Sequence, residues 1–579
     1  MCGIIGIVSK DTHSIKHDTL PLLKRLEYRG YDSAGVATLA GDIQKQTGHI
    51  GPFIDSVTDH RTQASIAHTR WATHGGVTAL NAHPHADGTG QFMIVHNGIL
   101  ENADALRASL PNESLVSETD SEVVAAFFHD RIGVQGLTTD AAIHEFIGAA
   151  EGTYAILLMQ RDDPTVYAIK HNSPLALTRA SSMHGATILA SDITAFGHLS
   201  DEAQFFEDQT YCRITPDSVA FFNAAGDPIE IEPKSFEWKD DASLDEYPHF
   251  MIKEIMEQPT TSRRLLESLK TMQAAELDTF ATTLKKARRV VFLSCGTSYH
   301  ASLIGAFLLN QLNYEAHTVI ASEFENFILV DPSTFVIAIS QSGETMDVIL
   351  PLKRIENQAM KIGSIVNVPY STIQRHSDTT LELLAGQEIC VASTKAYTNQ
   401  VIMLIKLAER LGYDVDCDKI PGRIEECLAS IDGIARELAV ELKHTREMYV
   451  LGRGAAYPMA REIALKLKEI DYIHAEGMMA GELKHGTLAL IEDGTPVICL
   501  IHDDNPAMRS STREVEARGA RSIVVSNTGS GEVNVPAGCE AEFAIYSCLF
   551  GHLLSYYIGV ERNLPIDKPR NLAKSVTVG

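Results

Sequence analysis

The sequence has few features of a secreted, membrane-bound or metal-binding chain. Its 579 residues include only nine cysteines, which are widely spaced and form neither a CxxC pair nor a Cys/His cluster. This pattern predicts no disulfide framework and no metal site, and it favours the reducing cytoplasm. No apolar run approaches the roughly 18 residues of a membrane span. The first ten residues, MCGIIGIVSK, lack the basic start of a secretory signal.

Positive charge is scarce as well. The chain has 49 Lys and Arg against 75 Asp and Glu, a formal net charge of −26. An acidic field repels phosphate backbones and anionic lipids, so we expect neither nucleic acid nor a membrane as a partner. A Walker GxxxxGK[ST] motif and a GxGxxG turn after a strand are both missing, so no nucleotide cofactor is expected. Small anionic substrates are still compatible with the negative net charge, because pockets bind them through local dipoles.

What is present is a globular composition, 45% hydrophobic, with two textures along the chain. The first part is rich in short β-type runs such as Phe92–His96 and Tyr154–Met159, with few helices, which predicts an α+β layered domain. After a polar, acidic stretch, apolar strands such as Thr334–Ser340 and Pro496–Ile501 alternate with longer helical patterns. Such alternation predicts parallel sheets covered by helices.

A weak internal repeat refines this division. RRVVFLSCGTSYHA and REMYVLGRGAAYPMA share a basic start, a strand, a glycine turn and the start of a helix. We therefore expect two related α/β subdomains. The predicted boundaries are 1–228 for the first domain, 229–247 for a linker, 248–435 and 436–565 for the two subdomains, and 566–579 for a C-terminal tail.

Cys2 is the first candidate catalytic residue. Removal of Met1 would leave Cys2 with a free α-amine, whose unperturbed pKa near ~8 suits it as the base for its own thiol. A cysteine at position 2 is weak evidence alone, because an incidental buried thiol is normally the favoured explanation. Four polar segments add weight to the catalytic interpretation: HTRWATHG at 68–75, NAHPH at 81–85, VHNGILEN at 95–102 and SETDSE at 117–122.

These segments contain the groups that hydrolysis of an amino-acid amide requires. An oxyanion hole could come from the Asn97 side chain and the Gly98 N–H, which follow a predicted strand. Arg70 could bind an α-carboxylate in a bidentate manner. Asp120, expected in the first turn of a helix, could hold an α-ammonium group.

The same motifs, with MCGIIGIV and EYRGYDSAG, resemble the class II glutamine amidotransferase domain. The resemblance implies an N-terminal-nucleophile glutaminase with an αββα layered sandwich. It implies Cys2 as nucleophile, with Asn97 and Gly98 as the oxyanion hole. The implied glutamine contacts are Arg70, Thr73, His74 and Asp120, and Trp71 is implied as a gate between two active sites.

The second half carries two hydroxyl-dense turns. Ser294–Ser298 and Ser340–Thr345 each follow an apolar strand and precede a helical pattern. One such turn is typical of a capped helix start. Two of them on neighbouring strands favour a phosphomonoester site, because backbone N–H groups, hydroxyls and helix N-termini converge there.

These turns resemble the sugar isomerase (SIS) domain. Further segments at 321–325, 391–400, 462–491 and 569–578 extend the resemblance over nearly the whole chain, to the glutamine–fructose-6-phosphate aminotransferase family. The family converts fructose 6-phosphate and glutamine to glucosamine 6-phosphate and glutamate, with ammonia channelled between two sites. The implied sugar-phosphate residues are Thr297, Ser298, Ser340, Gln341, Ser342, Thr345 and Ser393.

The resemblance also assigns the isomerisation chemistry. Glu462, Lys466 and Glu469 share one helix face, and their spacing alone favours a solvated, salt-bridged stripe. The family resemblance instead implies that they belong to the sugar-phosphate site, where Glu469 would move a proton between C1 and C2 of the sugar. His485 would open the sugar ring, and Lys574 would form an imine with the carbonyl. No metal or other cofactor is implied, and a site completed by His485 of a second subunit implies a homodimer.

Two alternatives remain open at this point. Another class II amidotransferase would need an SGGxDS loop or an acidic pyrophosphate motif, and neither is found. A non-catalytic sugar-phosphate sensor built from SIS domains would not need Glu469, His485 and Lys574 together. The chain departs from the family pattern at Thr487, where proline commonly follows HG, and at Gly579, which replaces a terminal acidic residue.

Overall fold

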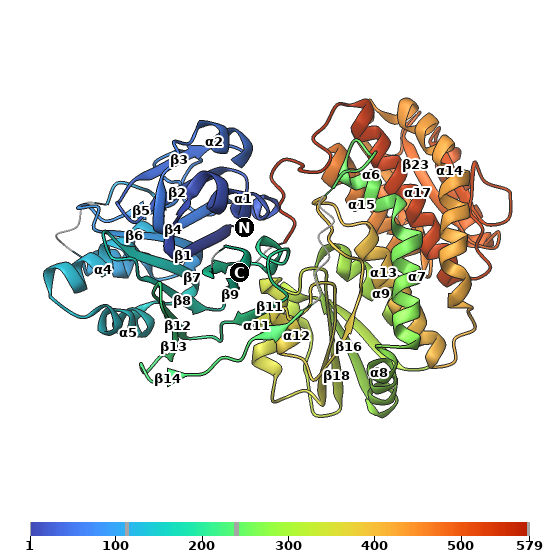
Figure 1. Cartoon of the computed structure of the whole chain (residues 1–579). Coiled ribbons are helices and arrows are strands. Elements are labelled where there is room, and N and C mark those ends of the chain that lie inside the picture. The colour runs from blue at the N-terminus through green and yellow to red at the C-terminus, as the bar shows by residue number, and fades with distance from the viewer. Residues whose placement is uncertain (1, 111–114, 184, 237–242, 576–579) are drawn as a thin grey trace. The chain divides into compact units, whose positions relative to one another are not determined.

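The computed structural model of the chain describes residues 2–110, 115–183, 185–236 and 243–575 (Figure 1). The terminal Gly579 lies outside these residues. The chain divides into two compact units. We call residues 1–240 with 575–579 the N-terminal unit and residues 241–574 the C-terminal unit. The domain boundaries expected from the sequence stay predictions.

The N-terminal unit is built on two antiparallel sheets. The larger has the order β15 (Lys234–Ser235), β11 (Glu202–Phe205), β9 (Ala176–Ala180), β10 (Ala186–Ala190), β1 (Gly3–Ser14), β4 (Arg61–Arg70), β2 (Ser33–Thr38) and β3 (Ile43–Thr47). The smaller has the order β14 (Pro228–Ile229), β13 (Val219–Asn223), β12 (Thr210–Ile214), β8 (Val166–His171), β7 (Gly152–Gln160), β6 (Phe92–Leu100) and β5 (His85–Ala86).

The sheets of this unit are joined by an apolar core. Ile4 and Ile66 of the larger sheet share a buried cluster with Val95 and Leu157 of the smaller one. Helices α4 (Glu122–Phe128) and α5 (Thr139–Ala149) pack on the other face of the smaller sheet. The short helix α1 (Leu20–Lys24) contacts β1 and β4. The expected α-β-β-α layering is confirmed.

The C-terminal unit contains two five-stranded parallel sheets. The first has the order β17 (Glu315–Ile320), β16 (Arg289–Ser294), β18 (Thr334–Ser340), β19 (Lys361–Val366) and β20 (Thr379–Glu382). The second has the order β22 (His474–Met479), β21 (Glu447–Gly452), β23 (Pro496–Ile501), β24 (Arg521–Ser526) and β25 (Val533–Asn534). Both follow the order second, first, third, fourth, fifth. The shared topology confirms two related α/β subdomains.

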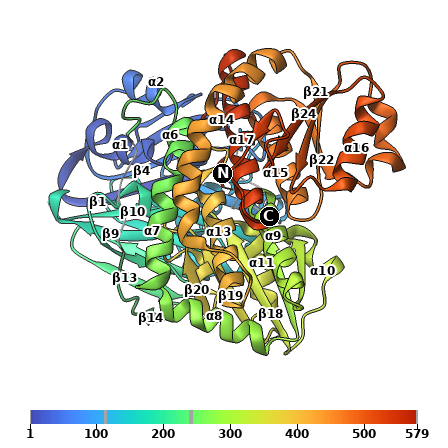
Figure 2. The ribbon, with the colours of Figure 1, turned by 90° about the vertical axis from the view of Figure 1, so that its right-hand side faces the viewer.

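Helices between these sheets form one continuous core. They include α9 (Gly296–Gln311), α13 (Lys395–Arg410), α14 (Ile420–Leu442), α15 (Ala456–Asp471) and α17 (Glu540–Glu561). Figure 2 shows α14 and α17 side by side, in agreement with their extensive contact. Among the described residues α17 alone is long and apolar enough to cross a membrane, but 94% of its most apolar window is buried within the protein. Its apolar surface is therefore used for packing.

The other α-helices divide between the two units. In the N-terminal unit they are α2 (Ile50–Ser56) and α3 (Ala103–Ala108). In the C-terminal unit they are α6 (Phe250–Met256), α7 (Gln258–Lys270), α8 (Ala274–Lys286), α10 (Phe324–Phe327), α11 (Met346–Ile355), α12 (Thr372–Arg375) and α16 (Pro506–Glu516).

Candidate active sites

Cys2 lies immediately before β1, beside the end of β4. Its Sγ accepts a hydrogen bond from the Trp71 backbone N–H at 3.3 Å. Burial raises the pKa of the Cys2 thiol. A thiol of this kind needs a base to become a nucleophile. The predicted base is the α-amine of Cys2 itself, and its formation depends on Met1, which lies outside the described residues.

The predicted oxyanion groups lie opposite Cys2 on β6. The Asn97 Nδ2 atom donates to the Cys2 carbonyl oxygen at 2.9 Å. Gly98 has a φ of +132°, and a Cβ added there would lie 1.9 Å from the Thr153 carbonyl oxygen. No other residue fits this position without distortion. The sequence prediction that the strand ends before Asn97 was wrong, because β6 continues through both residues to Leu100.

His68 fixes the orientation of the Asn97 amide. Its Nε2 atom lies 3.0 Å from the His96 carbonyl oxygen and 3.1 Å from Asn97 Oδ1. Both partners are acceptors, so Nε2 carries the proton and donates to them. Burial is the main cause that lowers the pKa of His68, to about 3. The neutral imidazole therefore holds Asn97 Oδ1 and leaves Nδ2 facing Cys2.

His68 belongs to a buried group of four histidines. The His83 ring stacks on His68 with centroids 4.1 Å apart, and His85 packs edge-on against His83. Burial lowers the pKa of His83, His85 and His96 as well. The group is uncharged at neutral pH, and no cluster of three or more metal-ligating side chains is found among the described residues.

The predicted glutamine contacts surround the same point. Arg70, the last residue of β4, donates to the Gly76 carbonyl oxygen at 3.1 Å and to the His74 carbonyl oxygen at 2.5 Å. Asp120 accepts from the Leu100 N–H at 2.9 Å. Burial lowers the pKa of Arg70, while the charges of Cys2, Asp32 and Asp120 act in the opposite direction.

Of the other predictions for this site, one was wrong and the rest stay predictions. Asp120 precedes the N-cap Ser121 of α4, so its expected place in the first helical turn was wrong. Thr73 and His74 are exposed on the segment after β4. Trp71 is half-buried and packs edge-on against Tyr31, with ring centroids 5.6 Å apart. The roles of these residues stay predictions.

The two hydroxyl-dense turns follow β16 and β18, which are neighbours in the first parallel sheet. Strand order reverses between them, and ligands of such sheets bind at this point. Ser340 Oγ accepts from the Gly343 N–H at 3.0 Å and lies 3.0 Å from Thr345 Oγ1. Ser298 Oγ accepts from Gln400 Nε2 at 3.0 Å. The fold thus brings Thr297, Ser298, Ser340, Gln341, Ser342 and Thr345 to one sheet edge.

The stripe on α15 is buried rather than solvated. Lys466 Nζ lies 3.0 Å from Glu462 Oε1 and 2.8 Å from Glu469 Oε2, and it donates to Thr297 Oγ1 at 3.0 Å. Burial opposes the ammonium, but both glutamates outweigh it and raise the pKa of Lys466. Glu469 keeps 19% of its side chain exposed, whereas Glu462 and Lys466 keep none. Glu469 is thus the member that a ligand could reach.

His300, on α9, was not foreseen from the sequence. Its Nδ1 atom lies 2.7 Å from Glu462 Oε2. Burial opposes ionisation of Glu462, but Lys466 and His300 outweigh it and lower its pKa to about 2. Its place on α9, three residues after the predicted site residue Thr297, is the sequence feature that could have identified it.

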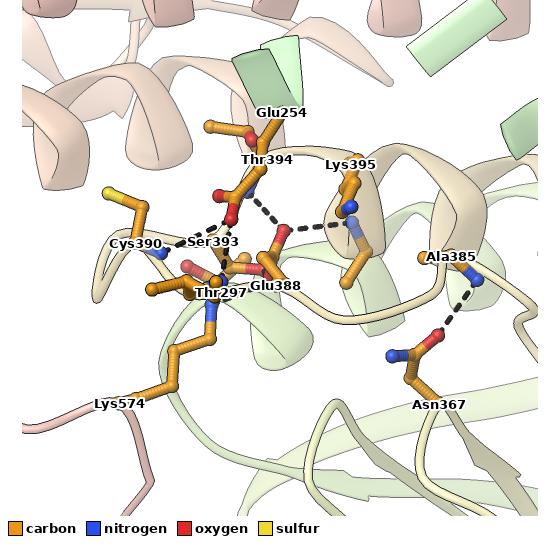
Figure 3. A network of polar contacts seen from close by, with 12 residues as sticks. Glu254, Thr297, Asn367, Ala385, Glu388, Cys390, Ser393, Thr394, Lys395 and Lys574 are labelled. Carbon is orange, nitrogen blue, oxygen red and sulfur yellow. Dashed lines mark hydrogen bonds and ion pairs between the residues drawn. The ribbon is translucent and has the colours of Figure 1, made fainter. Parts of the chain in front are cut away.

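Lys574 lies in the C-terminal tail and belongs to the C-terminal unit. Its Nζ atom lies 2.5 Å from Glu388 Oε2, and Ser393 Oγ donates to that oxygen at 2.8 Å (Figure 3). The Lys574 side chain is only 3% exposed. Glu388 was also not foreseen, because no motif marks the loop that carries it. Ser393, by contrast, was predicted from the segment 391–400.

His485 is the predicted residue that this chain does not bring to the others. It is exposed at the end of a short 3-10 turn, Leu483–His485, and its ring has no hydrogen-bond partner among the described residues. A second 3-10 turn starts at Thr487. A cavity of about 670 Å³ is lined by Gly296, His300, Arg461 and Glu482 among others, and Glu482 precedes His485 by three residues.

The N-terminal unit combines a cysteine near its N-terminus with two antiparallel sheets. The C-terminal unit has two related parallel sheets with hydroxyl-dense turns. Together these features define an amidotransferase fused to sugar isomerase domains. Family profiles agree with this class. The profile described as a glutamine amidotransferase domain matches residues 68–198, and the profile described as the SIS domain matches residues 283–410 and 441–535.

Whole-chain relatives narrow the class to one family. The chain is 38% identical over 608 residues to glutamine–fructose-6-phosphate aminotransferase (isomerizing) of Shouchella clausii, and 37% identical over 596 residues to that of Sulfurisphaera tokodaii, with all of each chain covered. The solved C-terminal domain of glucosamine-fructose-6-phosphate aminotransferase from Francisella tularensis matches with a TM-score of 0.51 and 31% identity, over 57% of this chain and 100% of that chain. This chain belongs to the glutamine–fructose-6-phosphate aminotransferase (isomerizing) family.

Proposed function

We propose that the chain converts D-fructose 6-phosphate and L-glutamine to D-glucosamine 6-phosphate and L-glutamate. The observation that carries the proposal is the presence of two reactive groups in one chain. Cys2 faces an amide donor at Asn97, and Lys574 lies buried in a unit with hydroxyl-dense turns. Family membership supports the same reaction.

In the N-terminal unit, the Cys2 thiol would attack the side-chain amide of glutamine. Asn97 Nδ2 and the Gly98 N–H would stabilise the oxyanion, and ammonia would leave. Water would then hydrolyse the thioester to glutamate. Arg70 and Asp120 would hold the α-carboxylate and the α-ammonium group, with Thr73 and His74 as further contacts.

In the C-terminal unit, the turns after β16 and β18 would hold the phosphate. Lys574 would form the imine with the sugar carbonyl, and Glu469 would move the proton between C1 and C2. Glu462 and Lys466 would set the charge around Glu469. The ammonia would pass from one site to the other through a channel that Trp71 gates.

Two further parts of the proposal concern assembly and location. His485 is exposed and, within the described residues, has no hydrogen bond to the sugar-site residues of its own chain, so we expect the partner subunit's His485 to complete the sugar site of a homodimer. All nine cysteines are free, as in proteins of the reducing cytoplasm, where we place this chain.

The experiment is a coupled assay of the purified chain. Incubation with glutamine and fructose 6-phosphate should yield glucosamine 6-phosphate and glutamate in equal amounts. Cys2→Ala should abolish this synthesis and spare isomerisation of fructose 6-phosphate to glucose 6-phosphate. Binding of the sugar phosphate without any turnover would contradict the proposal and favour a sensor.

A further inference from the structure

Glu388 is the group in direct contact with the Lys574 amine. Both side chains are almost fully buried, with Glu388 at 5% exposure and the Lys574 side chain at 3%. The distance from Lys574 Nζ to Glu388 Oε2 is 2.5 Å. A lysine ammonium cannot attack a carbonyl, because its lone pair is occupied by the proton. The proton therefore has to leave before the amine can react, and Glu388 is the base within reach.

The Glu388 carboxylate is held in one orientation by four donors. Oε1 accepts from the Thr394 and Ala396 N–H groups, at 2.9 and 3.1 Å, at the start of α13. Oε2 accepts from Ser393 Oγ and from Lys574. Burial opposes its ionisation, but Lys574 and these donors outweigh burial and lower the pKa of Glu388 to about 2. The proton acceptor is thus fixed in position and ionised.

A second glutamate lies beside Glu388 and is largely protonated at neutral pH. Glu254, on α6, accepts from the Ile389 and Cys390 N–H groups through Oε1, at 2.6 and 3.2 Å. Its Oε2 is buried and has no partner among the described residues. Burial and the neighbouring charge of Glu388 raise the pKa of Glu254 to about 8. Lys574 therefore faces one carboxylate ion rather than two.

The nearby cations do not compete for Glu388. Lys395 pairs with Glu257 at 2.6 Å. Lys466 pairs with Glu462 and Glu469 on α15. Lys574 is the cation that the described structure pairs with Glu388.

We propose that Glu388 is the catalytic acid–base partner of Lys574 in imine formation. This inference rests on the proposed reaction of Lys574 with fructose 6-phosphate. Glu388 Oε2 takes one proton from the Lys574 ammonium, and the freed lone pair adds to the C2 carbonyl of the open-chain sugar. The carbonyl oxygen gains a proton from the added nitrogen and becomes a hydroxyl. Glu388 then returns its proton to that hydroxyl, which leaves as water, so the protonated imine faces the carboxylate again.

The test is to trap the imine with borohydride in the full-length protein. Fructose 6-phosphate is added, the imine is reduced to a stable secondary amine, and the adduct at Lys574 is quantified by mass spectrometry against time. Glu388→Gln keeps the shape and the acceptor for Thr394 and Ala396 but removes the base. We expect trapping to slow by about 10² to 10³-fold. The KM for fructose 6-phosphate and the glutaminase rate should change little.

Glu388→Asp separates chemistry from packing. Aspartate keeps the base but shortens the side chain, whereas glutamine keeps the length and loses the base. A catalytic role predicts that the Asp variant traps faster than the Gln variant. A packing role predicts the reverse order, and that result would overturn the proposal, as would trapping by Glu388→Gln within threefold of the wild-type rate.

Two further arms complete the design. Glu382→Gln, a change at a partly buried glutamate elsewhere in the same unit, serves as the control and should trap at the wild-type rate. Where Glu388→Gln does not fold, Glu388→Ala is assayed with added formate. Restored trapping supports the proposal, and a folded variant that formate does not restore contradicts it. No adduct at Lys574 in the wild-type protein would instead overturn the proposed function.

Discussion

The two predicted sites differ in how the protein treats charge around the reactive atom. In the N-terminal unit, Asn97 faces Cys2 through an uncharged amide, and His68, one of four buried neutral histidines, orients that amide. In the C-terminal unit, Lys574 and Lys466 are buried with Glu388 and with Glu462 as ion pairs. Asn97 in the first site is oriented by a neutral histidine, while the ions Arg70 and Asp120 are the predicted glutamine contacts. The lysines of the second site are held in buried ion pairs.

This difference has consequences for stability as well as for chemistry. A buried ion pair is costly to break, because removal of one partner leaves an unpaired charge. Buried neutral histidines are insensitive to charge deletion but sensitive to protonation. The two units should therefore respond to different perturbations.

The largest expected effect follows removal of a buried cation. Lys466→Met leaves Glu462 and Glu469 without their shared partner, and we expect the free energy of unfolding of the C-terminal unit to fall by about 3–5 kcal/mol. Urea denaturation followed by hydrogen exchange in each unit measures it. Lys468→Met, an exposed neighbour on the same helix, is the control. Equal losses in the two variants would contradict the contrast.

The next largest effect concerns the N-terminal site around Cys2 and Asn97. Asn97→Ala removes the amide donor opposite Cys2, and we expect the glutaminase kcat to fall about 10² to 10³-fold, with imine trapping at Lys574 unchanged. Glutamate release and borohydride trapping, measured on the same preparation, check this. Gln46→Ala on the edge strand β3 is the matched amide control. A glutaminase rate within threefold of wild type would show that Asn97 does not stabilise the oxyanion.

Acid should weaken the N-terminal unit first. His68 has a pKa of about 3 in the folded chain, below its unfolded value near 6.5, so the unfolded chain binds the proton first as the pH falls. The stability present above pH 6.5 is lost progressively toward pH 3, and His68 alone contributes a loss of about 2 kcal/mol by pH 5. Hydrogen exchange at pH 7 and pH 5 should show faster opening of β4 and β6. Unchanged protection would contradict the neutral histidine cluster.

The strands were predicted from the sequence more accurately than the buried polar residues of the sites. Apolar runs defined β18 and β23 to the residue, because continuous hydrophobic strands have a clear pattern. Glu388, Glu254 and His300 escaped prediction, because they come from a loop and from separate helices that only tertiary folding brings to the site.

Local spacing also misjudged the surroundings of two motifs. The Glu462–Glu469 stripe has the pattern of a solvated helix face, and its burial depends on contacts with α9 and α17 that the local sequence does not encode. Asn97 and Gly98 have the composition of a turn, yet β7 holds them within a strand. In both cases tertiary contacts outweigh the local preference.

A further prediction concerns the pH dependence that Glu254 confers. Its pKa is raised from 4.5 to about 8, so its contribution to stability is full below pH 4.5 and is lost as the pH rises to 8. Glu254→Gln cannot titrate, so the variant should lose less stability than wild type over this range, by about 1 kcal/mol per pH unit. Urea midpoints at pH 5, 6.5 and 8 measure the difference. Parallel pH dependence in the two proteins would mean that Glu254 is already ionised at neutral pH.

The central claim is that one chain holds two separable reactive centres. The most direct measurement compares Cys2→Ala and Lys574→Ala in two assays, glutamate release from glutamine and borohydride trapping with fructose 6-phosphate. We predict that Cys2→Ala loses glutamate release and keeps trapping, and that Lys574→Ala loses trapping and keeps glutamate release. Loss of both activities in either folded variant would contradict the claim.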